Sequence, residues 1–311
     1  MYKKIICVLL LSACLFGMIG CSEKKNAGTK DDFVIGVVTK SKNSEYWMSV
    51  CAGLEKAAED KNVSVVILSP DTETDKEIQK RMIQDFLKMD VDALAVSPID
   101  SYDNQDYAAE AAKLGIPVYS YDTPVRDVKM PYIGINNEKA GYELARVMAE
   151  KMGHRGNIAV ISGSRSQASH DERVIGFEDY MSTEQDMCIE VTKSGYSNLR
   201  VPKQEMDKIQ EDYPDLDAIM TTSAVTALGL TEATAGTGIA IASVDDQEDA
   251  IRAVEDGTIT ALAAQPSYDI GYETVTYIVN DRDGVSQENE KILDTYIVTK
   301  ENVKEYEDLK K

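Results

Sequence analysis

The stretch Phe33-Val-Ile-Gly-Val-Val38 decides how the rest of the chain can fold. It is short and almost wholly apolar, which is typical of a strand that is covered on both faces. The next segment places Trp47, Val50 and Leu54 at helical spacing, so we expect a helix there. A second apolar run, Val63–Leu68, then predicts another buried strand. This order predicts two parallel strands joined by a crossover helix.

The same alternation continues along the chain in two successive series. In the first series we expect helices near 78–89 and 107–114 and strands at 93–96 and 116–121. The second begins with a strand at 132–135 and continues with helices near 140–152, 170–181, 224–235, 246–255 and 268–280, and strands near 157–162, 217–221, 239–244, 258–263 and 294–298. Two series without a long linker predict an α/β fold of two similar, doubly wound parallel-sheet lobes.

The last helix and strand are too few for a third domain, so we expect them to complete the two lobes. The N-terminal lobe would comprise residues 33–135 and 266–291, and the C-terminal lobe residues 136–265 and 292–311. The chain would then cross between the lobes more than once. A hinge of several crossings permits closure and resists twisting, as a ligand clamp requires.

The first twenty residues have the features of an export signal. A positively charged start is followed by an uncharged apolar run from Ile5 to Ile19, which is too short to span a bilayer comfortably. The run ends in Met18-Ile19-Gly20-Cys21, which resembles the lipobox of bacterial lipoproteins. We therefore expect a lipoprotein signal peptide at 1–20, lipidation of Cys21 and a polar tether at 21–32. The alternative is an ordinary secretory signal or a stray apolar terminus.

The composition indicates a globular protein with a strongly acidic surface. Of the 311 residues, 43% are hydrophobic and 28% are charged, and the formal net charge is -21. A surface of this charge argues against nucleic acid or an anionic lipid as the partner. About 290 residues after the signal are enough for two domains of ordinary size.

Polar side chains follow the predicted strands, at the points where ligands bind in an open α/β sheet. The segments are Thr39–Trp47, Tyr121–Pro124, Ser162–Arg173, Thr221–Ser223, Val244–Gln247 and Ala264–Pro266. Aromatic rings beside carboxylates and amides suit a polyol, because the rings cover its C–H faces and the polar groups bind its hydroxyls. The sequence therefore predicts a small polar ligand such as a sugar.

Motifs for catalysis and cofactor binding are missing from the sequence. It has no Gly-x-Ser-x-Gly elbow, no phosphate-binding loop and no Cys/His cluster with metal-ligand spacing. Gly236-Thr-Gly238 precedes a predicted strand instead of following one, so it does not fit a dinucleotide site. We expect a binding protein without cofactor or metal, and not an enzyme.

Four motifs carry a family resemblance: Asn43–Trp47, Tyr119–Asp122, Asp245 with Glu255–Gly257, and Ala264–Pro266. Together they resemble the periplasmic sugar-binding proteins of ABC importers, the ribose- and galactose-binding group, whose lobes are shared with lactose-type repressors. The resemblance runs from about Val34 to Val298. It implies the type I fold of these proteins, with the ligand held between the lobes.

The resemblance also implies roles for individual residues. Tyr46 and Trp47 would form an aromatic platform and Ser44 a polar contact, whereas Asp122, Asp245 and Gln265 would bind hydroxyls, with Tyr196 as an aromatic of the second lobe. Three positions depart from the family: its second-lobe Arg falls on Asp171, next to His170, while Ser223 and Thr123 replace other polar contacts. Arg165 or Arg173 is a candidate to replace the missing cation. These departures argue against ordinary ribose as the ligand.

Several of these residues also have a purely structural interpretation. Trp47 could belong to the core, Asp122 could start a turn and Asp245 could cap a helix. His170 could equally be an exposed helix start, and Ser223 suits a helix cap better than a ligand contact.

The expected function is that of a monomeric, membrane-anchored extracytoplasmic lipoprotein that binds a sugar-like ligand and delivers it to an ABC permease. One alternative is a sensor that presents its ligand to a membrane histidine kinase, and another is an extracytoplasmic enzyme. A repressor is disfavoured, because an export signal stands where a DNA-binding helix-turn-helix would be required.

Overall fold

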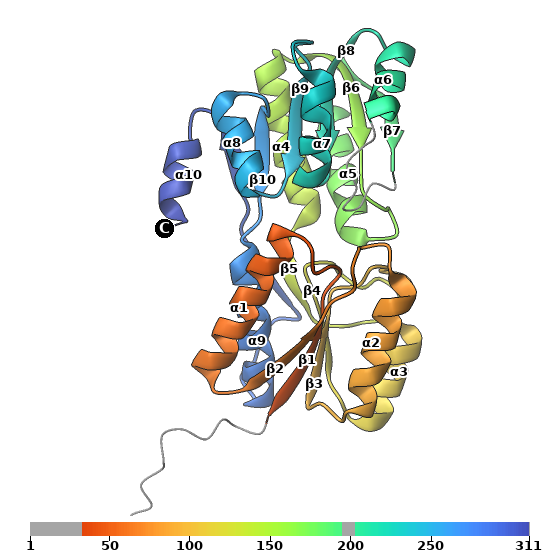
Figure 1. Ribbon diagram of the computed structural model, residues 1–311, viewed down its shortest axis with the longest axis vertical. Helices are drawn as coiled ribbons and strands as arrows, with labels where there is room; N and C mark the ends of the chain where they lie inside the picture. Colours follow the sequence, from red (N-terminus) through yellow and green to blue (C-terminus); the bar gives the residue numbers. More distant parts are fainter. Residues whose placement is uncertain (1–32, 195–202, 311) are drawn as a thin grey trace, which may run out of the picture. The chain divides into compact units, whose positions relative to one another are not determined.

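Two β-sheets, each with six strands among the described residues, form the framework of the protein (Figure 1). The computed structural model describes residues 33–194 and 203–310. The predicted signal peptide, the tether, Cys21 and Tyr196 therefore lie outside the described residues. The predicted fold class, two α/β lobes with predominantly parallel sheets, is confirmed.

The sheet of the N-terminal lobe is parallel throughout its described pairs. Its strands are β1 (Val34–Val38), β2 (Ser64–Leu68), β3 (Ala93–Val96), β4 (Val118–Tyr121), β5 (Tyr132–Ile135) and β11 (Glu290–Leu293), in the order β11-β5-β4-β3-β1-β2. Its helices are α1 (Glu45–Lys61), α2 (Lys76–Lys88), α3 (Gln105–Leu114) and α9 (Ser267–Arg282). Helices α1 and α9 cover one face and α2 and α3 the other (Figure 1). Gly53 and Gly271 let α1 and α9 approach closely, since a Cβ on either would lie 2.0 Å from a backbone oxygen of the other helix.

The sheet of the C-terminal lobe repeats this plan with one antiparallel edge. Its strands are β6 (Arg155–Ile161), β7 (Asp186–Lys193), β8 (Leu216–Thr221), β9 (Ala240–Val244), β10 (Ala261–Ala264) and β12 (Tyr296–Thr299), in the order β12-β10-β9-β8-β6-β7. Its helices are α4 (Asn137–Met152), α5 (Ala168–Met181), α6 (Lys203–Asp212), α7 (Ala224–Thr234), α8 (Glu248–Asp256) and α10 (Val303–Leu309). Only β12 runs antiparallel to its neighbour among the described pairs, and it pairs with β10.

The chain passes between the two sheets three times within the described residues. It crosses after β5, returns after β10 to form α9 and β11, and crosses again between β11 and β12. The lobe boundary expected after residue 291 falls inside β11, which pairs with β5 as far as Leu293. The short connection to β12 therefore begins two residues later than expected.

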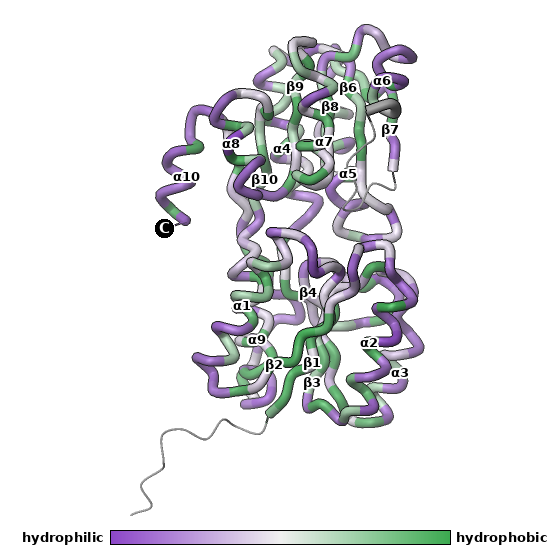
Figure 2. The backbone as a smooth tube through the Cα atoms, in the orientation of Figure 1, coloured by the Kyte–Doolittle hydropathy of each residue, from purple (hydrophilic) through white to green (hydrophobic). Residues whose placement is uncertain are grey.

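Hydropathy explains which elements the sequence reveals. The inner strands β1, β3, β8 and β9 are buried and apolar, as Figure 2 shows for β1 and β3. The elements absent from the sequence-based expectation are β7, α6, β11 and α10, and β7 and β11 are exposed edge strands. An edge strand that buries few side chains leaves no apolar run in the sequence. No helix in the described parts is both long and apolar enough to span a bilayer.

Candidate functional site

A small cavity lies where the strands of both sheets end, between the two lobes. It is lined by Lys40, Ser44, Tyr46, Trp47, Glu73, Asp122, His170, Arg173, Ser223, Val225, Asp245, Gln247 and Gln265. Its volume is about 30 Å³, which is room for one or two water molecules. The lobes must therefore separate before a molecule of sugar size can enter.

The cavity brings together most of the residues that the sequence singled out. Eight of the predicted residues line it: Ser44, Tyr46, Trp47, Asp122, His170, Ser223, Asp245 and Gln265. Thr123 lies just behind the wall, fully buried, and donates to Asp122 over 2.8 Å. Asp171 does not reach the cavity, because its carboxylate pairs with Arg165 on the outside. Arg173, and not Arg165, supplies the second-lobe cation at the cavity wall.

Asp122 accepts three hydrogen bonds from its own chain and forms an ion pair with Lys40. Tyr46 Oη donates to Oδ1 over 2.6 Å, while Ser97 and Thr123 donate to Oδ2 over 2.8 Å each and Lys40 Nζ lies 3.0 Å away. Burial alone would raise the pKa of Asp122, but Lys40 and these hydrogen bonds hold it down to about 2. The left-handed backbone of Asp122, φ 61°, aims its carboxylate at this cluster. It therefore fixes Lys40 and Tyr46 in place as an ionised group.

Lys40 is the centre of the N-terminal-lobe wall. Its ammonium group lies 2.8 Å from Thr123 Oγ1, 2.9 Å from Gln167 Oε1 and 4.0 Å from Glu73 Oε2. Because Gln167 belongs to the C-terminal lobe, Lys40 also joins the two lobes. Its ammonium group therefore donates two hydrogen bonds and also pairs with two carboxylates, those of Asp122 at 3.0 Å and Glu73 at 4.0 Å.

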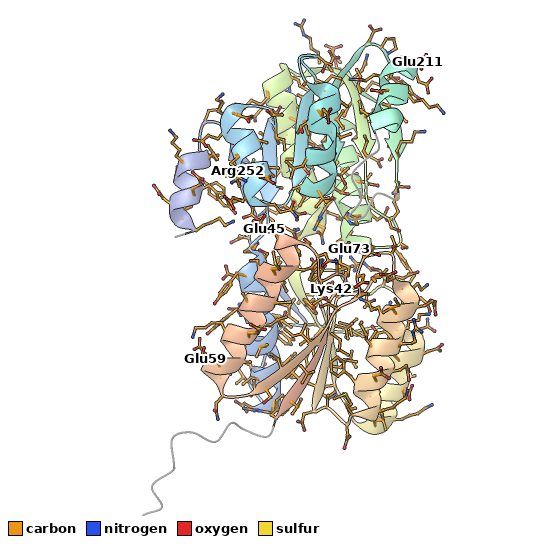
Figure 3. All side chains as sticks on the ribbon, viewed as in Figure 1. Lys42, Glu45, Glu59, Glu73, Glu211 and Arg252 are labelled. Carbon is orange, nitrogen blue, oxygen red and sulfur yellow. The ribbon has the colours of Figure 1, made fainter. Side chains whose placement is uncertain are left out.

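The aromatic platform is oriented by a carboxylate that follows β2. Trp47 is 1% exposed and donates through Nε1 to Glu73 Oε1 over 2.9 Å. Its ring meets Tyr46 and Tyr121 edge-on, with centroids 5.3 and 6.3 Å away. Trp47 therefore belongs to the core and also lines the cavity. Figure 3 shows its partner Glu73 at this end of the lobe.

The first helix of the C-terminal-lobe wall, α5, contributes His170 and Arg173. Arg173 donates from Nε to Asn137 Oδ1 and from Nη1 to the Thr222 carbonyl, both over 2.9 Å. Burial and the charge of Arg173 lower the pKa of His170 well below its usual range, so the ring is neutral. Its Nδ1 is buried and has no hydrogen-bond partner among the described residues. His170 therefore lines the cavity and carries a buried polar atom that the described residues do not satisfy.

The ends of β9 and β10 supply the remaining polar wall. Gln265 donates from Nε2 to Asp245 Oδ1 over 2.5 Å. Burial raises the pKa of Asp245 to about 6, although Arg173 and Gln265 act in the opposite direction. The carbonyl oxygens Gln265 Oε1 and Gln247 Oε1 are buried and have no partner in the part of the chain that the structure describes.

Five residues that line the cavity were not among the predicted contacts, although Arg173 was one of the two candidates for the missing cation: Lys40, Glu73, Arg173, Val225 and Gln247. Lys40, Arg173 and Gln247 lie inside segments already recognised as strand ends, so the same rule applied to every polar residue would have found them. Glu73 follows β2 by five positions. The segment after β2 was not among the strand ends that the sequence analysis considered, so Glu73 was missed. Val225 gives no polar signal.

Direct contacts join the lobes around the cavity. Thr123 and Ser169 hydroxyls lie 2.9 Å apart, and the Ala168 amide donates to Ser101 Oγ over 2.9 Å. At the opposite side, the Glu248 amide donates to the Glu45 carboxylate over 3.0 and 3.2 Å. Within the described ranges no group of His, Cys, Asp and Glu is placed to hold a metal ion.

Two α/β lobes joined by three crossings, with a polar cavity between their strand ends, are the architecture of a ligand-binding protein. The family described as "Periplasmic binding protein domain" matches residues 35–284. The chain belongs to this family.

Relatives and solved structures agree with this assignment. The ribose import binding protein of Bacillus subtilis (strain 168) is 26% identical over 267 residues, which cover 85% of this chain and 86% of that protein. The D-allose-binding periplasmic protein of Escherichia coli (strain K12) is 25% identical over 249 residues, which cover 76% and 80%. A sugar-binding protein of a Bacillus halodurans sugar ABC transporter has a similar structure, with a TM-score of 0.76, 26% identity and coverage of 89% of this chain and all of that one.

Proposed function

We propose that this protein captures a sugar or a similar small polyol between its lobes and delivers it to an ABC transporter. The observation that carries the proposal is the cavity itself, where an aromatic platform faces buried carboxylate, amide, imidazole and guanidinium groups from both lobes. The names of the relatives describe sugar import and sugar binding. Sensing through a histidine kinase is not favoured, because the ribose-binding relative is named as an import protein.

The mechanism follows from the division of contacts between the lobes. Tyr46, Trp47 and Glu73 belong to the N-terminal lobe, whereas Arg173 and Asp245 belong to the other. A ligand reaches both sets only when the lobes close on it, so its binding energy favours the closed form. Release requires the permease to favour the open form.

A calorimetric screen of sugars and polyols against the full-length chain tests the proposal. We expect one of them to bind with a Kd of about 10 μM or below, since a few hydrogen bonds to charged groups contribute about 1.5–3 kcal/mol each. Trp47→Ala should weaken that binding at least tenfold, whereas Tyr102→Ala, an exposed aromatic outside the cavity, should not. Failure of every sugar and polyol to bind would contradict the proposal.

The location is proposed from the family and the N-terminal sequence together. A periplasmic binding protein works outside the cytoplasm, and the lipobox-like Met18–Cys21 supports anchoring of a monomer through a lipid on Cys21. Cys21→Ser should release the protein from the membrane fraction and abolish labelling with a radioactive fatty acid. A variant that stayed membrane-bound and labelled would remove the anchor from the proposal.

A further inference from the structure

One corner of the cavity contains hydrogen-bond acceptors that have no donor among the described residues. It is built by Asp245 after β9, Gln247 two residues later and Gln265 after β10, which are 7%, 8% and 2% exposed. The hydrogen bond between Gln265 and Asp245 brings two of the three side chains together. Gln247 stands at the N-cap of α8, yet its side chain makes no capping hydrogen bond. The oxygens Gln247 Oε1 and Gln265 Oε1 both lack a partner among the described residues.

Asp245 differs from the other two carboxylates of the cavity. Asp122 lies 3.0 Å and Glu73 4.0 Å from Lys40, whereas no cationic nitrogen in the described chain lies within 4.0 Å of Asp245. Arg173 is near enough to influence Asp245 electrostatically, but its Nε and Nη1 donate to Asn137 and Thr222. A buried carboxylate without a paired cation is unfavourable. The corner therefore has no cation paired with Asp245, and its oxygens Gln247 Oε1 and Gln265 Oε1 receive no hydrogen bond from the described residues.

We propose that the ligand carries a primary ammonium group, received by Asp245 Oδ2, Gln247 Oε1 and Gln265 Oε1, and is thus an amino sugar or amino polyol. The inference rests on the proposed function and names the ligand class of that same cavity. An ammonium group has three N–H donors and no acceptor, which matches one carboxylate and two amide oxygens. A hydroxyl donates one hydrogen bond only, so it would leave acceptors of this corner unsatisfied.

The surrounding charges allow a cation at this position. The N-terminus of α8 would oppose a cation through its dipole, but Glu45 accepts from its first amide and Glu248 and Asp249 stand in its first turn. Asp246, the next residue, is paired with Lys310. His170 is neutral and Lys40 is bound to carboxylates, so Arg173 is the opposing charge in this part of the described cavity wall.

Matched pairs of sugars, each with a hydroxyl and an amine at the same carbon, test the proposal by calorimetry on the full-length chain at pH 7. The pairs are D-glucose with D-glucosamine, D-galactose with D-galactosamine, D-mannose with D-mannosamine, D-glucose with 6-amino-6-deoxy-D-glucose, and inositol with an inosamine. We expect at least one amine to bind about tenfold or more tightly than its hydroxyl counterpart, as a charge-assisted contact requires. A neutral sugar that binds while each of its amine counterparts binds equally or more weakly would overturn this inference and leave the proposed function standing.

The variant Asp245→Asn separates charge from shape. It should weaken binding of the amine by about tenfold to a hundredfold and that of the hydroxyl counterpart by a smaller factor, about threefold to tenfold. Asp171→Asn is the matched control, because that carboxylate lies on the same lobe but outside the cavity. Equal losses for amine and hydroxyl in Asp245→Asn would count against the inference. If none of the hydroxyl compounds and none of their amine counterparts bound, the result would contradict the proposed function and the inference with it.

Discussion

The two walls of the cavity differ in how far the protein satisfies its own polar groups. On the N-terminal-lobe wall, Asp122 accepts a hydrogen bond of 2.6 Å from Tyr46 and forms an ion pair of 3.0 Å with Lys40. On the C-terminal-lobe wall, three buried polar side-chain atoms, on His170, Gln247 and Gln265, have no partner among the described residues. The first wall is thus organised before a ligand arrives, while the second keeps hydrogen-bonding capacity that only a ligand or water can use.

The largest effect should follow from removing the carboxylate of Asp122 from the N-terminal-lobe wall. Asp122→Ala leaves the Lys40 ammonium buried without its paired carboxylate, which should lower the free energy of unfolding by about 3–5 kcal/mol. Binding should fall at least a hundredfold, because Tyr46 also loses its partner. Urea unfolding and calorimetry measure the two effects.

A matched control is Asp71→Ala, which removes an exposed carboxylate paired with Lys42. Its effect on unfolding should stay below about 1 kcal/mol. If Asp122→Ala were as mild as this control, Lys40 would not depend on Asp122 and the N-terminal-lobe wall would not be organised as described.

The pH dependence of stability should distinguish the two carboxylates. The pKa of Asp245 is raised from 3.8 to about 6, so the folded protein holds this proton more tightly and stability rises as the pH falls from 7 towards 4. The pKa of Asp122 is lowered to about 2, so its contribution is present above pH 4 and is lost as the pH falls through 2. The Asp245 contribution is on the order of 2–3 kcal/mol between pH 7 and 4.

Urea unfolding at half-unit steps of pH measures this contribution in the protein without ligand. Asp245→Asn should remove the part of the rise that Asp245 causes, and Asp171→Asn should keep it. A wild-type profile that Asp245→Asn does not change would show that Asp245 titrates near its ordinary value and is not desolvated.

Much of the fold and part of the site follow from the sequence, for a physical reason. Buried inner strands such as β1 leave apolar runs, and the polar residues after them must gather at one sheet edge. The sequence alone therefore placed Trp47, Asp122 and Asp245 at strand ends, and all three line one cavity in the structure. Hydrogen bonds between distant residues leave no such pattern: Lys40 and Gln167 are 127 positions apart.

Departures from the family pattern were harder to interpret from the sequence. The spacing put Asp171 at the position of the missing arginine, but α5 turns this side chain outward to Arg165 and places Arg173 inside. Residues two positions apart on a helix point in different directions, so position in an aligned motif cannot decide which of them reaches the cavity.

A smaller effect is expected from removing a contact behind the C-terminal-lobe wall. Tyr306 and Lys310, on and just after α10, contact Asp246 Oδ2 over 2.5 and 2.6 Å, and Asp246 lies between Asp245 and Gln247. Tyr306→Phe removes one hydrogen bond to a charged group, which should lower the free energy of unfolding by about 1.5–3 kcal/mol. Ligand binding should weaken about threefold to tenfold, because the two cavity residues lose part of their support.

The control for Tyr306→Phe is Tyr296→Phe. The ring of Tyr296 stacks on that of Tyr306, but no hydrogen bond between Tyr296 and Asp246 is present among the described contacts. A loss of stability without any loss of affinity would show that α10 supports the lobe and not the cavity.

The smallest effect is expected at the mouth of the cavity, where Glu45 of α1 accepts a hydrogen bond from the Glu248 amide across the lobes. Glu45→Ala removes this contact in the closed form only, so it should weaken ligand binding by about twofold to fivefold and leave the unfolding of each lobe unchanged. Glu59→Ala, on the same helix and paired only with Lys56 among the described contacts, should change neither (Figure 3). Because Glu45 also balances the helix dipole beside Asp245, its loss should weaken a cationic ligand more than its neutral counterpart. Calorimetry with one matched amine and hydroxyl pair measures both effects. An equal change for the two ligands would show that Glu45 stabilises only the closed form and does not favour a cationic ligand.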